Sequence, residues 1–287
     1  MVLRIKPDSV YSSTNPIRIS DPIGFHADEK VSPDKTATSA GTVNDHTGIV
    51  YDRIRQVLIH GNGSYNLLPD LRNKDSFSQY GQDKYLSNLF GSKRNGFFVE
   101  IGAYDGQSLS NTLLLEMKNN WTGLLIEANP HMFSLIASVN RNCYAINCCL
   151  GYTNASLTFT LAGMISSADA VITAQHRNRI NSERINFKND KTYNKTVTVQ
   201  CYSLLDLLNV IGTQKVDYFS LDVEGAELYI LESIDWNQID IDVFTIETDQ
   251  HRDKILSFMK DHGYKWLTHM KGDDIFSKRR DLHNITC

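Results

Sequence analysis

The sequence contains no apolar run long enough to cross a lipid bilayer. A membrane-spanning helix needs about 20 consecutive, mostly apolar residues. The longest apolar stretches here, such as Leu113-Leu114-Leu115, have the length of a strand or a helical turn. The segment Met1–Lys6 also lacks the apolar stretch of a secretory signal peptide. We therefore expect no transmembrane segment, and the cytoplasm is the default compartment.

The sequence also lacks a concentration of basic charge. It has 29 Lys plus Arg against 33 Asp plus Glu, a net charge of −4, with both signs interspersed. A nucleic-acid-binding protein usually presents a strongly basic face. We therefore predict no nucleic-acid partner. The 287 residues, 41% of them hydrophobic, can build a sizeable core in one large or two ordinary domains.

Cysteine is scarce, and its spacing excludes a zinc site. The 5 cysteines form no paired C-x-x-C motif. Their odd number leaves at least one thiol unpaired, and the adjacent Cys148 and Cys149 suit the alternate faces of a strand better than a bridge. We expect reduced cysteines with structural roles, at Cys143, Cys148, Cys149, Cys201 and Cys287.

Asn-x-Ser/Thr triplets, the acceptor motif for N-linked glycans, are present in slight excess. About three or four would arise by chance in an Asn- and Thr-rich chain. The excess is too small to decide between the cytoplasm and the secretory pathway. The triplets begin at Asn62, Asn120, Asn154, Asn194 and Asn284.

The composition divides the chain into three parts. Residues 1–48 hold most of the prolines and few aromatics, which predicts a disordered tail. Residues 49–75 form a lead-in segment with one short amphipathic stretch. From Ser76 onward, short apolar runs alternate with helical periodicity, which is typical of βαβ units around a mostly parallel sheet with helices on both faces. Residues 163–195 interrupt this pattern and are either a lid over a site or an insertion.

The element boundaries follow from periodicity and capping residues. Strands are expected at 97–101, 124–126, 143–150, 157–161, 197–200, 216–221 and 243–246, and within 264–276. Helices are expected at 107–118, from Asn129-Pro130 to Val139, after a Ser203 cap, through Leu228 and Leu231, and at 251–262.

Acidic residues lie at the carboxyl ends of four predicted strands. In an open α/β sheet, ligands bind at these ends near the point where the strand order reverses. The residues that a ligand would meet are therefore Glu100 and Asp105 after the first strand, Glu127 after the second, Asp222 and Glu224 after a later one, and Glu247.

The loop after residues 97–101 decides between cofactors. A dinucleotide site uses G-x-G-x-x-G, but only Gly102 and Gly106 are present, with Ala103, Tyr104 and Asp105 between them. Asp105 would repel a pyrophosphate, so a nicotinamide-dependent oxidoreductase is disfavoured. S-adenosylmethionine carries a sulfonium and no phosphate, and acidic groups suit it. Glu127 is placed to accept hydrogen bonds from the ribose hydroxyls; the alternative is a turn with a charge at a helix start.

Ordered motifs after Ser76 resemble the FkbM family of S-adenosylmethionine-dependent methyltransferases, and most closely its animal Star-like branch. The resemblance covers about residues 76–280. It implies a Rossmann-like methyltransferase fold and methyl transfer to a hydroxyl, often on a sugar or polyketide. The family commonly has Lys where this chain has Ser220. The matching segments are Ser78–Asp83, Phe97–Gly106, Ser110–Thr112, Trp121–Pro130, Asn147–Leu150 and Leu221–Glu227.

Further cofactor contacts are expected around this pocket. Gln79 and Gln82 belong to a segment that can fold over the site, and Ser166, Ser167 and Ala168 can border the adenine; both groups can equally be ordinary surface or turn residues. The cofactor set is Gln79, Glu100, Gly102, Ala103, Tyr104, Asp105, Gly106, Asn111, Glu127, Ala128, Asn129, Ser167 and Ala168.

Asp222 and Glu224 are the candidate bases, because they lie two apart at a strand end and would share one face. Alternatively, one orients the substrate while the other caps the following helix. His176, beside Arg177 and Arg179, is a third candidate, although a lone loop His is more often solvated. Asp222, Glu224 and Glu247 are a less favoured alternative set for Mg²⁺ or Mn²⁺.

The sequence therefore predicts an S-adenosylmethionine-dependent O-methyltransferase acting on a sugar, a glycan or another small polar acceptor. The alternative is a non-catalytic binding or trafficking protein of the secretory pathway on the same fold, since fold alone does not establish activity. The oligomeric state stays open.

Overall fold

The computed structural model describes residues 42–151, 155–183, 193 and 195–278. An eight-stranded sheet forms its centre, in the order β1-β4-β3-β2-β9-β10-β12-β11. The neighbouring strands from β4 to β10 run parallel, while β1, at one edge, and β12, next to β10, run antiparallel to their neighbours. The strands are β1 (Ile59–His60), β2 (Phe97–Ile101), β3 (Thr122–Ile126), β4 (Tyr144–Ile146), β9 (Lys215–Leu221), β10 (Asp240–Glu247), β11 (Lys265–Met270) and β12 (Asp273–Ser277).

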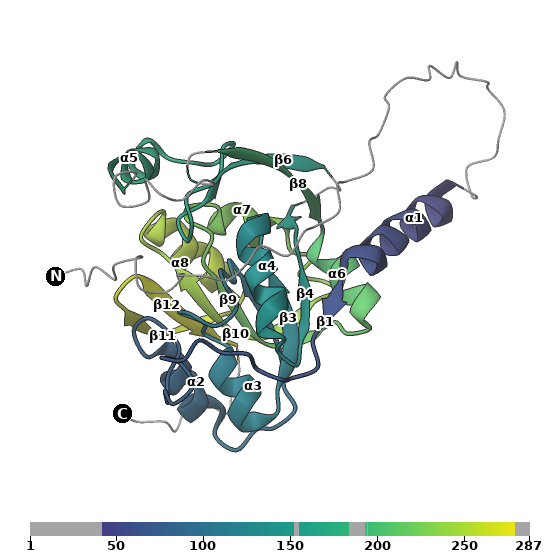
Figure 1. Ribbon diagram of the computed structural model, residues 1–287. Coiled ribbons are helices and arrows are strands. Elements are labelled where there is room, and N and C mark those ends of the chain that lie inside the picture. The colour runs from purple at the N-terminus through teal and green to yellow at the C-terminus, as the bar shows by residue number, and fades with distance from the viewer. Residues whose placement is uncertain (1–41, 152–154, 184–192, 194, 279–287) are drawn as a thin grey trace, which may run out of the picture.

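Helices cover both faces of this sheet (Figure 1). Buried side chains of α1, α6, α7 and α8 pack on one face with Val99, Phe219 and Phe244, and those of α2, α3 and α4 pack on the other with Phe98 and Tyr218. The bounds are α1 (Thr42–Val57), α2 (Gln82–Phe90), α3 (Leu113–Asn119), α4 (Pro130–Val139), α6 (Leu204–Ile211), α7 (Glu227–Ser233) and α8 (Arg252–Asp261). The predicted α/β fold with a mostly parallel sheet is confirmed.

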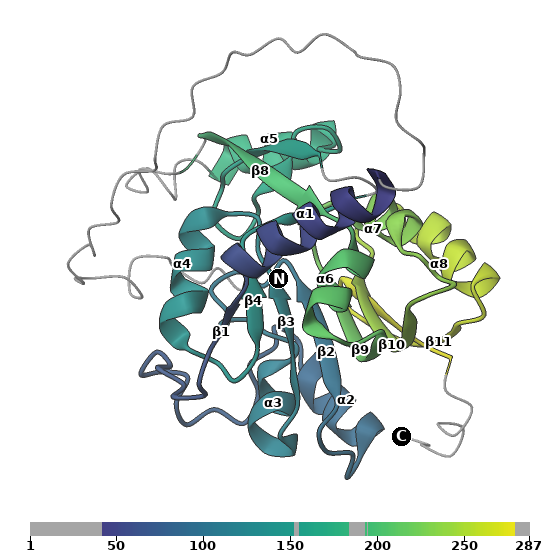
Figure 2. The same cartoon turned by 90° about the vertical axis from the view of Figure 1, so that its right-hand side faces the viewer.

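A second sheet of four short strands lies with α5 above the carboxyl ends of the main parallel strands (Figures 1 and 2). Its order is β5-β8-β6-β7. The elements are β5 (Cys149–Leu150), β6 (Ser156–Thr160), β7 (Ser167–Ala168), α5 (Ala174–Glu183) and β8 (Thr196–Tyr202). The segment 163–195, expected to lack periodicity, therefore contains a strand and a helix; 184–192 and 194 lie outside the described residues.

The capping signals located two helices well. The Asn129 Oδ1 accepts a hydrogen bond from the backbone N–H of His131, and Pro130 occupies the first position of α4. The Ser203 Oγ accepts one from the backbone N–H of Asp206 at the start of α6. Both starts coincide with the predictions.

The helix predicted at 107–118 is wrong in its first half. α3 begins only at Leu113, and Leu109 has a φ of 62°, which a helix does not allow. The strand predicted at 143–150 is likewise two strands, β4 and β5, in different sheets. The first helical segment, α1, begins at Thr42, inside the range predicted to be a tail.

The expectation of reduced cysteines is wrong for one pair. β5 and β8 pair in parallel with Cys149 opposite Cys201, and the two side chains form a disulfide. Cys143 and Cys148 are free and buried, whereas Cys287 lies outside the described residues. Sequence spacing could not reveal which strand lies beside β5. Within the described part of the chain, no helix has the length and apolar character needed to span a membrane.

Candidate active site

A cavity of about 770 Å³ lies between the carboxyl ends of β2, β3, β9 and β10 on one side and the second sheet with α5 on the other. The strand order reverses beside β2, since β3 follows on one flank and β9 on the other. This is the position at which open α/β sheets bind ligands. The volume falls within the range of about 300–1,000 Å³ seen for small-molecule sites.

The turn after β2 forms part of the cavity wall. Gly102 has a φ of 77°, and a Cβ at this position would come within 1.8 Å of the Asp222 carbonyl oxygen. Only glycine fits there. Ala103 and Tyr104 line the cavity beside it, while Asp105 and Gly106 do not. The Asp105 Oδ1 instead accepts hydrogen bonds from the backbone N–H groups of Gln107 and Ser108, which stabilises the turn.

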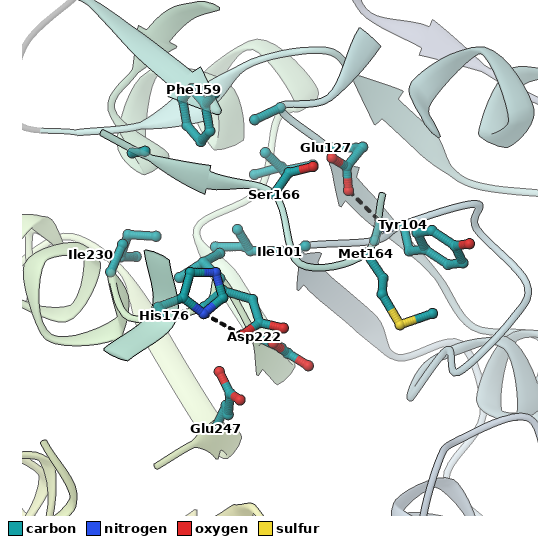
Figure 3. Close-up of a pocket in the computed structure, with 18 of the residues that line it drawn as sticks. Ile101, Tyr104, Glu127, Phe159, Met164, Ser166, His176, Asp222, Ile230 and Glu247 are labelled. Carbon is teal, nitrogen blue, oxygen red and sulfur yellow. Dashed lines mark hydrogen bonds and ion pairs between the residues drawn. The ribbon is translucent and has the colours of Figure 1, made fainter. Parts of the chain in front are cut away.

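Glu127 joins the ends of β2 and β3. Its Oε2 accepts a hydrogen bond of 2.8 Å from the backbone N–H of Tyr104 (Figure 3), and its Oε1 accepts one of 2.7 Å from that of Asn129. Burial raises the pKa of Glu127 to about 7, against the lowering effect of these donors. Glu127 and Ala128 line the cavity, whereas Asn129 does not.

Glu100 is mainly engaged in holding the loop that leads to α3. Its carboxylate accepts hydrogen bonds from the backbone N–H of Asn111 (2.8 Å) and from the hydroxyls of Ser110 and Thr112. These contacts explain why the predicted helix does not form across 107–112. Glu100 touches the cavity, but Asn111 does not; the Asn111 Nδ2 donates to the buried Ser220 Oγ.

Arg141, which the sequence analysis missed, ties this loop to the turn after α4. Its guanidinium lies 2.8 Å from the Glu116 carboxylate and 3.6 Å from that of Glu100, and it donates to the Gly106 carbonyl oxygen. The side chain is almost fully buried. Its charge is compensated by these carboxylates, as a buried guanidinium requires. A single Arg after a helix gives no sequence signal for such a role.

Asp222 follows β9 and faces the cavity. Its carboxylate accepts no hydrogen bond from any described residue. Enclosure by protein, followed by repulsion from Glu224 and Asp273, raises the pKa of Asp222 well above its usual value, although the side chain keeps surface open to the cavity. Figure 3 shows Asp222, His176 and Glu247 on one side of the cavity and Glu127 on the other.

Glu224 belongs to a different arrangement. Its Oε2 lies 2.7 Å from Arg179 Nη1 and 3.3 Å from His176 Nδ1. Burial raises the pKa of Glu224 to about 7, against the lowering effect of the Arg179 guanidinium. The strand ends at Leu221, and Glu224 has a φ of 56°, so Asp222 and Glu224 do not follow the shared strand face that was expected.

His176 is buried in α5 and is not a solvated loop residue. A contact of 2.9 Å joins its Nε2 to the Ile165 carbonyl oxygen. Because a carbonyl can only accept, Nε2 carries the proton, and Nδ1 faces Glu224. Burial lowers the pKa of His176, and the Arg179 charge lowers it further. With the proton on Nε2, Nδ1 has only a lone pair, so it can accept a hydrogen bond from a protonated Glu224 carboxyl, while Arg179 holds the ionised carboxylate.

Glu227, also missed by the sequence analysis, forms the start of α7. Its carboxylate accepts hydrogen bonds from the backbone N–H groups of Val223 and Gly225, the role expected of Asp222 or Glu224. The only sequence signal for this role was that Glu227 is an acidic residue in the first turn of α7.

Glu247, at the end of β10, keeps its proton. Burial, followed by repulsion from Asp222, raises the pKa of Glu247 to about 11, so its carboxyl group is neutral.

Three carboxylates converge closely enough to hold a metal ion among the described residues. Oxygens of Asp222, Glu227 and Glu247 all lie within 4.8 Å of one another. This set differs from the predicted alternative, because Glu227 takes the place of Glu224, which is engaged by Arg179 and His176. Of the remaining predicted residues, Gln79 and Ala168 line the cavity, whereas Ser167 does not and donates to the Glu224 carbonyl oxygen.

The strand order and the position of the cavity define a Rossmann-like α/β protein with a ligand site at the switch point. Residues 100–266, more than half of the chain, match the family described as Methyltransferase FkbM domain. The chain belongs to this family. The matched range includes the turn after β2, Glu127 and the carboxylates at the ends of β9 and β10.

The chain is also similar, at low sequence identity and low TM-score, to solved structures of methyltransferases. One is a precorrin-6y C5,15-methyltransferase from Geobacter metallireducens, with 14% identity, a TM-score of 0.36 and coverage of 74% of this chain and 92% of that one. Another is a TehB-like methyltransferase from Corynebacterium glutamicum, with 10% identity, a TM-score of 0.38 and coverage of 82% and 100%. A search of curated protein sequences finds no match.

Proposed function

We propose that this FkbM-family protein is an S-adenosylmethionine-dependent O-methyltransferase whose acceptor is a hydroxyl of a sugar, a glycan or another small polar molecule. The observation that carries the proposal is the position of Asp222. Its free carboxylate lies at the switch point, and its carbonyl oxygen lies against Gly102 in the cofactor turn.

The cofactor half of the cavity has the groups that S-adenosylmethionine needs. The Glu127 carboxylate keeps lone pairs for two ribose hydroxyls while backbone N–H groups hold it in place. Leu157 and Phe159 of β6 provide apolar wall for the adenine. The turn at Gly102 provides close backbone approach, and no phosphate-binding glycine pattern is present.

The acceptor half is acidic and polar. Asp222, Asp249 and Asp273 line it together with Gln79 and Gln250. Carboxylates and amides hydrogen-bond hydroxyl groups well. Arg179 is the one Lys or Arg among the described residues of the wall, and Glu224 engages it. A phosphate-bearing acceptor, including a nucleic acid, is disfavoured by this charge.

When bound, the cofactor supplies an electrophilic methyl group on a sulfonium. The cavity walls would hold the acceptor hydroxyl in position for the transfer, an effect that contributes up to roughly 7–11 kcal/mol in favourable systems. The Asp222 carboxylate would take the proton of the acceptor hydroxyl. Its raised pKa makes the ionised carboxylate a stronger base. Glu224, held by the Arg179 guanidinium, would orient the acceptor.

A metal-assisted version of the same transfer has its own observation, the convergence of Asp222, Glu227 and Glu247. These carboxylates would hold Mg²⁺ or Mn²⁺, which would lower the pKa of the acceptor hydroxyl. In the metal-free version, Glu247 keeps its proton beside Glu227. Chelation therefore separates the two versions.

Calorimetry with S-adenosylmethionine and S-adenosylhomocysteine tests the cofactor. Methyl transfer is then assayed with a panel of glycans, free sugars and small alcohols, with and without chelator, using D222N as the inactive reference. We expect both cofactor forms to bind and at least one neutral polyhydroxy acceptor to be methylated. Binding of neither cofactor form would contradict the enzyme function and favour a non-catalytic binding protein. If methyl transfer is lost only in the assays that contain chelator, the metal-assisted version is favoured.

A further inference from the structure

Two Asn-x-Ser/Thr triplets of the described chain lie at the amino ends of the parallel strands, opposite the cavity at their carboxyl ends. β1 is antiparallel to β4, and His60 pairs with Tyr144, the first residue of β4. Asn62 therefore lies just beyond the amino end of β4. Asn120 precedes β3 and lies where that strand begins. The other triplets begin at Asn154, Asn194 and Asn284, outside the described residues. A glycan on Asn62 or Asn120 would leave the cavity open.

The Asn62 side chain has a free amide nitrogen. Its Oδ1 accepts hydrogen bonds from the Ser64 backbone N–H (3.1 Å) and from Asn140 Nδ2, whereas its Nδ2 donates to no described residue. Asn62 is exposed. Asn120 is exposed too, but its Nδ2 donates a 2.7 Å hydrogen bond to Asn95 Oδ1. The amide nitrogen that a glycan would occupy is therefore available at Asn62 and engaged at Asn120.

The conformation of the Asn62 triplet is encoded locally. The hydrogen bond from Ser64 N–H to Asn62 Oδ1 closes an Asx turn within three residues. Gly63, between them, has a φ of 75°, and a Cβ there would come within 3.2 Å of Asn142 Cβ. Glycine adopts this conformation without strain. The turn can therefore form before the domain has folded, and the folded protein leaves its amide nitrogen in solvent.

The disulfide provides an independent indication of compartment. Cys149–Cys201 joins β5 to β8. Structural disulfides persist in the lumen of the endoplasmic reticulum and outside the cell, and are rare in the reducing cytosol. Asn-linked glycans are added to proteins that enter the same route. The two features agree, although they lie at opposite ends of the parallel strands.

We propose that Asn62 is an N-glycosylation site of this protein. The donor is an oligosaccharide on a lipid pyrophosphate. Asn62 Nδ2 forms a bond to the anomeric carbon as the bond from that carbon to the pyrophosphate oxygen breaks. The lipid pyrophosphate leaves, and the amide nitrogen gives one proton to the base of the transferring enzyme. No oxidation or reduction takes place.

The protein isolated from the cells that produce it provides the direct test. An amidase that removes N-linked glycans converts a glycosylated Asn to Asp, and heavy-oxygen water labels that Asp. We expect the label at residue 62 by peptide mass spectrometry. Recovery of the Asn62 peptide entirely as unlabelled Asn, with Cys149 and Cys201 as free thiols, overturns the proposal.

A variant series in secretory expression checks the site itself. We expect N62Q and S64A each to remove one amidase-sensitive mobility shift, while S64T, which keeps the triplet, retains it. N120Q is the matched control and leaves the Asn62 glycan in place. Because S64T and S64A both preserve Asn62 and its contact with Asn140, a folding defect of N62Q does not decide the result. Equal mobility of wild type, S64A and S64T after secretion overturns the proposal. No step depends on methyl transfer.

Discussion

Gly102 packs so closely against the carbonyl oxygen of Asp222 that a Cβ atom added to Gly102 would lie 1.8 Å from that oxygen. This approach brings together two segments that are far apart in the sequence, the turn after β2 and the acidic segment after β9. It also sets the distance between the proposed cofactor turn and the proposed base. Gly102 is therefore required by a contact as well as by its positive φ.

Gly102→Ala should disrupt the site. The new methyl group overlaps backbone that cannot move without shifting β9, so we expect destabilisation of about 1–3 kcal/mol or more, measured by urea unfolding, and loss of cofactor binding. Gly212→Ala is the matched control, because Gly212 has a φ of 89° but nothing within 4 Å of its Cβ position. That variant should lose about 1 kcal/mol and bind cofactor normally. Equal behaviour of both variants would remove the steric argument.

The positions of several residues could be predicted from the sequence because their signals are local. Gly102 and Glu127 directly follow the apolar runs of β2 and β3, and Asn129 is the N-cap of α4, with its hydrogen-bond partner two residues away. The failures depend on partners far along the chain: Glu100 holds residues 110–112 and prevents the expected helix, and β8 brings Cys201 opposite Cys149. Periodicity contains no information about such contacts. His176 likewise contacts Ile165 and Glu224, and the second of these lies in a distant segment of the chain.

Cofactor affinity should depend on the protonation of Glu127. The pKa of Glu127 is about 7 in the free protein, and the ionised carboxylate is the better acceptor for ribose hydroxyls. The dissociation constant measured by calorimetry should therefore fall as pH rises from 6 to 8. E127Q should bind roughly 10- to 100-fold more weakly at pH 8, from the loss of about 1.5–3 kcal/mol in hydrogen bonds to a charged group.

The control for this pH dependence is E224Q, since the pKa of Glu224 is also about 7. We expect E224Q to keep the change in affinity between pH 6 and 8 and E127Q to lose it. The reverse result would assign the titration to the acceptor half of the cavity.

The disulfide should contribute measurably to stability. Cys149 and Cys201 are separated by 52 residues, and closing a loop of this size restricts the unfolded chain. C149S/C201S should lower the free energy of unfolding by about 2–4 kcal/mol, measured by denaturant titration under oxidising conditions. Reductant should destabilise the wild type and leave the double variant unchanged. Destabilisation of both proteins by reductant would indicate another bridge.

Asp222 and Glu224 should have separable roles. D222N removes the proposed base while keeping the shape of the side chain, so we expect kcat to fall by about 10²- to 10⁴-fold, with cofactor affinity close to that of the wild type. E224Q breaks the 2.7 Å ion pair with Arg179 and loosens the group that orients the acceptor. It should raise KM for the acceptor and lower kcat less than D222N does.

The matched control for Glu224 is Glu183, a cavity-lining residue of α5 whose carboxylate lies 3.5 Å from Arg179 Nε. E183Q removes the longer ion pair of the same guanidinium and keeps the 2.7 Å pair between Arg179 and Glu224, so it should change kcat and KM less than E224Q does. Steady-state kinetics with the methylated acceptor and calorimetry with cofactor measure both effects. If D222N keeps full activity while E224Q loses it, the proton acceptor is Glu224, and the contact with His176 Nδ1 becomes part of the proton path.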